Sequence, residues 1–98
     1  MRTLLKCTLD TEASNKAIQD GSLPGIIEKL MASTKPEAAY FTTYGGYRTV
    51  FLFFDMTDSS MMPVIGEPLF NHLNAKLELL PVMNQAELQK GMGAFMAG

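Results

Sequence analysis

The sequence has few of the residues that most metal and redox sites use. It contains one cysteine, one histidine and no tryptophan. A single cysteine excludes an intramolecular disulfide framework, and one cysteine with one histidine cannot supply a Cys/His zinc site. We therefore expect neither a metal nor another cofactor.

An excess of basic charge is also missing. Eight lysine and arginine residues stand against ten acidic residues, which gives a formal net charge of −2. Proteins that bind nucleic acid displace counterions with a basic surface, so this composition argues against a nucleic-acid partner.

Long apolar runs are absent as well. No apolar run of about 18 residues occurs, which argues against a membrane-spanning helix. The segment 1–7 starts like a signal peptide, but its two leucines before Lys6 fall short of the roughly 7–15 apolar residues that such a peptide needs. The sequence predicts a cytoplasmic protein with no membrane partner.

Enough apolar material is present for one core. The chain has 98 residues, 47% of them hydrophobic, so it can bury one core but not two. We expect a single domain over residues 1–90. Residues 91–98 include three glycines, which predicts a flexible tail.

Alternating and helical patterns give the order of the elements. Strands are predicted over residues 2–9, 38–44, 47–56 and 76–82, and helices over 12–19, 23–34, about 61–73 and, as a short extra C-terminal helix, up to Lys90. Pro68 removes a helical hydrogen bond, so we expect a kink or a break there. Gly45-Gly46 predicts a two-residue hairpin that places Tyr44 opposite Tyr47.

This order predicts an α+β fold. Split βαβ units of this kind form a ferredoxin-like βαββαβ sandwich with both helical segments on one face of an antiparallel sheet. The expected strand order is 4-1-3-2, with the first and third strands in the centre.

The two faces of that sheet differ in composition. Aliphatic and apolar residues at alternate positions, among them Phe41, Val50, Leu52 and Phe54, suit the helices. The opposite face then carries five aromatic rings, at Tyr40, Tyr44, Tyr47, Phe51 and Phe53. With half of their area exposed, these rings would leave about 400–600 Å² of apolar surface, the top of the range for a monomer. A second copy of the same sheet is the simplest cover, which predicts a homodimer.

Several segments resemble a known group of proteins. The segments are Lys35–Thr42, Arg48-Thr49, Asp55-Met56, Glu67–Phe70, Asn74-Ala75 and Pro81–Met83. They are similar to an uncharacterised family of roughly 95-residue bacterial proteins in the dimeric α+β barrel superfamily. The resemblance implies a dimeric barrel made from two ferredoxin-like domains. The superfamily also includes muconolactone isomerase-like enzymes and cofactor-independent monooxygenases.

Candidate site residues fall into two sets. Glu78 and His72 are the candidate catalytic bases, because a raised carboxyl pKa or an imidazole suits proton transfer near neutral pH. The candidate ligand-binding residues on or near the aromatic face are Lys6, Tyr40, Phe51, Phe53, Asp55, Arg48 and Asn74. Each also has a structural interpretation: a cross-strand ion pair for Lys6 with Glu78, a pair with Glu37 for Arg48, and a helix end for His72.

Three functions stay open at this point. The first is a homodimer that binds a small apolar or aromatic organic ligand between its two sheets. The second is a cofactor-independent isomerase or monooxygenase-like enzyme, with Glu78 or His72 as base and Tyr40 or Lys6 stabilising an enolate. The third is a purely structural or regulatory dimer. The residues alone do not decide whether the protein is an enzyme.

Overall fold

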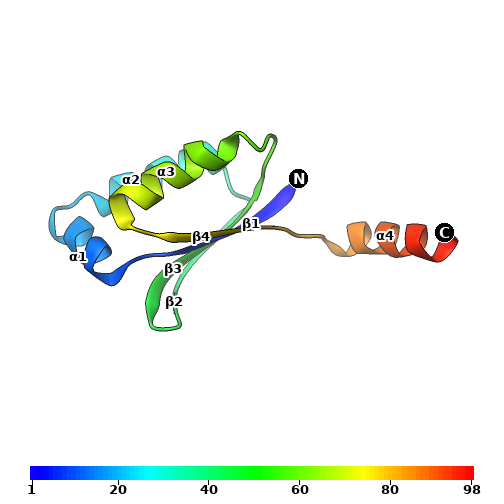
Figure 1. Ribbon diagram of the computed structural model, residues 1–98, viewed down its shortest axis with the longest axis horizontal. Coiled ribbons are helices and arrows are strands. Elements are labelled where there is room, and N and C mark those ends of the chain that lie inside the picture. The colour runs from blue at the N-terminus through cyan, green and yellow to red at the C-terminus, as the bar shows by residue number, and fades with distance from the viewer.

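A computed structural model describes residues 1–98 and arranges one antiparallel sheet beneath a layer of helices, with a further helix extending to one side (Figure 1). The elements, in chain order, are β1 (Arg2–Thr8), α1 (Thr11–Gln19), α2 (Leu23–Thr34), β2 (Ala38–Tyr44), β3 (Tyr47–Asp55), α3 (Met61–Leu73), β4 (Lys76–Pro81) and α4 (Gln85–Ala97).

The sheet order β2-β3-β1-β4 confirms the predicted order of the strands. All three pairings are antiparallel, and Tyr44 lies opposite Tyr47 as the two-residue turn requires. Gly45 and Gly46 have φ values of 61° and 85°, which glycine adopts without steric cost. The turn therefore fixes which residues of β2 and β3 share a face.

Local signals place the helices between the strands. The Asp10 carboxylate accepts a hydrogen bond from the amide of Ala13 at 3.0 Å and so caps α1. The helix α2 carries Pro24 in its first turn, where the missing N–H costs little, and ends at Lys35 in a left-handed conformation. The helix α3 continues through Pro68 to Leu73, so the break considered at this proline does not occur.

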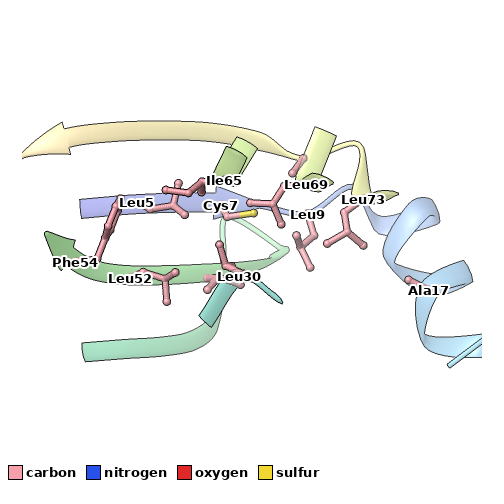
Figure 2. Packing of buried hydrophobic residues seen from close by; sticks show 12 residues of the cluster. Leu5, Cys7, Leu9, Ala17, Leu30, Leu52, Phe54, Ile65, Leu69 and Leu73 are labelled. Atoms are coloured by element: carbon pink, nitrogen blue, oxygen red, sulfur yellow. The ribbon is translucent and has the colours of Figure 1, made fainter. Parts of the chain in front are cut away.

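The core lies between the helices and one face of the sheet (Figure 2). Each of the central strands turns alternate side chains toward the helices, and α2 and α3 supply the other half of the core. The fully buried large side chains are Leu5, Leu52, Phe54, Leu69 and Leu73. These positions confirm the predicted assignment of the aliphatic face to the helices.

One residue of that face is not covered by the helices. Phe41 lies on the edge strand β2 toward the hairpin, and 57% of it is exposed. The helices cover the central strands and leave this end of the edge strand uncovered. Alternation along a strand gives the face of a residue but not how far the opposite layer extends.

The C-terminal segment differs from the prediction. The last helix does not end at Lys90, because α4 continues through the glycines to Ala97. It extends away from the sheet and has no buried residue (Figure 1). None of the four helices combines the length and apolarity that crossing a membrane would need.

Candidate functional site: the open face of the sheet

The face of the sheet that points away from the helices carries the aromatic side chains predicted for it. We call this surface the open face; its principal residues are Leu4, Lys6, Tyr40, Tyr44, Tyr47, Phe51, Phe53, Glu78 and Leu80. The three tyrosines are each about half exposed or more, and Phe51 and Phe53 are partly buried. The open face is therefore an apolar surface that the chain itself does not cover.

Strand register brings four candidate residues into one row across the sheet. Tyr40 lies opposite Phe51, Phe51 opposite Lys6, and Lys6 opposite Glu78. Directly paired residues on one face have Cβ atoms about 4.5–5.5 Å apart, so their side chains are in reach of one another. Four of the predicted site residues therefore form one continuous row from edge to edge.

Lys6 is the charged centre of this row. Its Nζ atom lies 3.4 Å from the Oε2 atom of Glu78 and 4.1 Å from the centre of the Tyr44 ring. Its side chain is 24% exposed, whereas that of Glu78 is 60% exposed. The lysine thus lies within the aromatic surface, while the carboxylate stays hydrated at the edge strand.

The Tyr44 ring connects this cation to the neighbouring aromatic residue. Tyr44 and Phe51 pack edge to face, with ring centroids 5.9 Å apart and ring planes at 77°. A cation over a tyrosine ring is attracted by the negative face of the π system. Tyr44 belonged to the predicted aromatic face but not to the predicted site residues. Strand register could not have identified it, because Tyr44 lies opposite Tyr47, four residues from Phe51 along β3.

Polar groups on the open face still have free hydrogen-bonding capacity. The Lys6 ammonium has three N–H donors, and Glu78 is its only polar partner in the chain. The Tyr40 hydroxyl makes no hydrogen bond within the chain. A molecule lying on the face could accept hydrogen bonds from both groups while its apolar part contacts the rings.

Phe53 and Asp55 lie farther along β3. Phe53 pairs with Ala38 and Leu4, and Leu4 pairs with Leu80, so this second row of the face is entirely apolar. Asp55 lies four residues beyond Phe51, or about 13 Å along the strand. Its carboxylate accepts a hydrogen bond from the amino group of Met1 at 2.6 Å. It is thus at one end of the face and outside the charged row.

His72, Arg48 and Asn74 do not join the row. His72 lies in a groove of about 540 Å³ between α2 and α3, on the opposite side of the sheet from Glu78. The Arg48 Nη1 atom donates to Ser14 Oγ at 2.6 Å and to Asn15 Oδ1 at 2.9 Å, which fixes α1 against β3. Asn74 ends α3 in a left-handed conformation, with φ of 46°.

The predicted ion pair between Glu37 and Arg48 does not form. Glu37 instead accepts a hydrogen bond from the Nε atom of Arg2 at 3.0 Å, and Nη1 of the same arginine contacts Glu87 in the first turn of α4. We call this ion-pair cluster of Arg2, Glu37 and Glu87 the Arg2 clasp. The bond to Glu37 is the main cause of a raised pKa of Arg2. The amide of Asn84 is the main cause of a lowered pKa of Glu87. The clasp connects β1, β2 and the start of α4.

Together, the topology and the uncovered face define an α+β protein with ferredoxin-like topology and one apolar sheet surface open to a partner or ligand. Comparisons of the chain with protein-family models and with curated proteins give no match.

Proposed function

We propose that the protein is a homodimer that packs sheet to sheet and binds a small apolar or aromatic ligand between the two sheets. The observation that carries this proposal is the row Tyr40–Phe51–Lys6–Glu78, in which a lysine lies among half-exposed aromatic rings. Ligand sites typically combine apolar walls with a few convergent polar groups, as this row does. The resemblance to dimeric α+β barrel proteins agrees with the same arrangement.

The side chains of this row indicate which class of ligand the site would bind. The Tyr44 and Phe51 rings offer flat apolar contacts, and the ammonium of Lys6 favours an oxygen acceptor or a negative charge. A planar compound that carries a carbonyl or carboxylate group satisfies both. A fully apolar compound would leave the Lys6 donors without partners, which costs free energy in a closed site.

The second function, a cofactor-independent enzyme, is favoured by one specific contact. Glu78 lies 3.4 Å from Lys6, so a base and a cation that stabilises an enolate would adjoin the same ligand. His72 has no part in this version, because it lies between the helices on the other side of the sheet. A structural or regulatory dimer with a closed interface is the third outcome.

Native mass spectrometry of the protein purified from its own organism tests the proposal. We expect a dimer that carries extra mass, which is released when the sample is denatured. The variant Lys6→Met should lose this extra mass. The control variant His72→Gln should keep it, because its side chain is remote from the open face.

The other outcomes separate the alternatives. A wild-type dimer without added mass would contradict the proposed ligand binding and would favour a structural or regulatory dimer. A monomer contradicts the sheet-to-sheet arrangement itself. If Tyr40→Phe and Glu78→Gln still bind the released compound but no longer convert it, the enzyme replaces the binding protein as the function.

A further inference from the structure

The helix α4 carries an apolar stripe that nothing in its own chain covers. Leu88, Met92, Phe95 and Met96 follow the spacing i, i+4, i+7, i+8, which places them on one side of the helix. Phe95 is 75% exposed and Met96 is 77% exposed. Lys90, two residues from Leu88, lies on the opposite side. The helix therefore has one apolar side that no other part of the chain covers.

A helix of this kind needs a packing partner. It has 13 residues and includes Gly91 and Gly93 in its interior. Isolated helices of about 12–15 residues are marginal in water, and each interior glycine costs about 1 kcal/mol relative to alanine. Packing of the apolar stripe is the usual source of the missing stability.

The start of α4 directs the helix away from its own domain. The Asn84 side chain accepts from the amide of Glu87 at 2.8 Å, and the Asn84 amide donates to Glu87 Oε1 at 2.9 Å, which forms a capping box. Glu87 is also held by Arg2 of the clasp. Figure 1 shows α4 continuing past the end of β4, and the chain measures 56 Å along its longest axis but only 28 Å and 18 Å across.

We propose that α4 is an arm that packs against a second copy of this chain and covers the end of its open face. This inference rests on the proposed homodimer. The arm leaves the sheet beside the apolar row of Leu4, Phe53 and Leu80, since Pro81 at the end of β4 pairs with Thr3. In a two-fold dimer whose axis runs along the strands, the same end of both sheets meets. The arm of each copy then starts beside the apolar row of the other.

The area of the two surfaces supports a second copy as the occupant. A stable interface buries about 800 Å² of each partner. The aromatic rings of the open face offer about 400–600 Å², which is less than this amount. The four side chains of the arm add roughly 300 Å². Together the rings and the arm reach the size of a standard dimer interface.

The contact can be observed directly in mixed dimers. One population carries ¹³C-labelled methionine methyl groups, and the other carries protonated phenylalanine in an otherwise deuterated background. Isotope-filtered spectra should show nuclear Overhauser effects from the Met92 and Met96 methyl groups of one copy to the Phe53 ring of the other. Met92→Leu and Phe53→Leu assign the two signals.

Substitutions on the two sides of α4 provide the matched test. Met92→Ser with Phe95→Ser should weaken the dimer at least tenfold in sedimentation equilibrium. Lys90→Ser, on the opposite side of the same helix, should leave the dissociation constant unchanged. No residue of α4 is buried in the single chain, so these changes spare the core.

The failures of the two proposals are distinguishable. A wild-type dimer with no intermolecular effects from the arm, or with equal constants for both variants, overturns the arm and leaves the sheet-to-sheet dimer intact. If the nuclear Overhauser effects from the arm go to residues of the groove between α2 and α3 instead of Phe53, the arm does not pack on the open face of the partner. A wild-type monomer overturns both proposals.

Discussion

Cys7 and Lys6 are neighbours in β1 with opposite environments. The thiol of Cys7 points into the core and is fully buried, whereas Lys6 reaches the open face. Burial raises the pKa of Cys7 to about 12, because the thiolate loses its hydration. The only cysteine is thus a small core residue and not a nucleophile at neutral pH.

Stability in alkali should report this burial. The ordinary pKa of the thiol is 9.0 and the folded value is about 12. Below pH 9 both states are protonated and the full stability is present. Between pH 9 and about 12 the unfolded chain releases the proton first, so this group lowers the free energy of unfolding by about 1.4 kcal/mol per pH unit.

Urea unfolding of the wild type and of Cys7→Ala from pH 7 to 11 checks this expectation. The other titrating groups are the same in both proteins, so the difference between the two curves isolates the thiol. The difference in free energy of unfolding between the two proteins should be constant up to pH 9. Above pH 9 the wild type should lose stability relative to Cys7→Ala. Parallel curves over the whole range would show that Cys7 ionises normally in the folded protein.

Single residues also show where sequence reasoning is reliable. The alternation in β1 and β4 correctly placed Lys6 and Glu78 on one face of neighbouring strands, because successive side chains of a strand point to opposite faces. It could not identify the partners of Arg48, which come from α1. A long side chain can reach several elements, and the sequence contains no register between a helix and a strand.

Among the elements, the hairpin was the most predictable and α4 the least. Gly45 and Gly46 fix the pairing of β2 and β3 by backbone conformation alone. The end of α4 is different, because its glycines oppose a helix while its capping box and apolar spacing favour one. The glycines led to a predicted helix end at Lys90. In the structure the capping box and the apolar spacing outweigh them, and the helix ends at Ala97.

Alanine at Gly91 should strengthen α4. A Cβ atom added at this position meets no atom within 4 Å, so the substitution removes only the entropic cost of glycine. Gly91→Ala should stabilise the helix locally by about 0.5–1 kcal/mol. Amide hydrogen exchange of residues 89–96 should slow several-fold, without a change in the exchange of β1 or β3.

Gly45→Ala is the contrasting control. This glycine also has no neighbour within 4 Å, but its φ of 61° strains any residue with a Cβ atom. The control should therefore lose stability where Gly91→Ala gains it. Faster exchange in Gly91→Ala would contradict the helical state of this segment.

At the scale of the whole molecule, helices cover one face of the sheet and leave the other face exposed. The helices bury a continuous core on one side, while the tyrosines, Leu80 and the stripe of α4 remain exposed. The sequence predicted this asymmetry, because β3 is apolar at successive positions and a strand with one solvated face would alternate. It did not predict the groove between α2 and α3, which depends on how two helices pack.

The most direct test of this account is the oligomeric state in sedimentation equilibrium at micromolar concentration. Tyr40 and Phe41 are adjacent on β2, are 62% and 57% exposed, and lie on opposite faces of the sheet. The wild type and Phe41→Lys should sediment as dimers, and Tyr40→Lys should sediment as a folded monomer. A monomeric wild type, or equal behaviour of the two variants, would contradict a dimer formed through the open face.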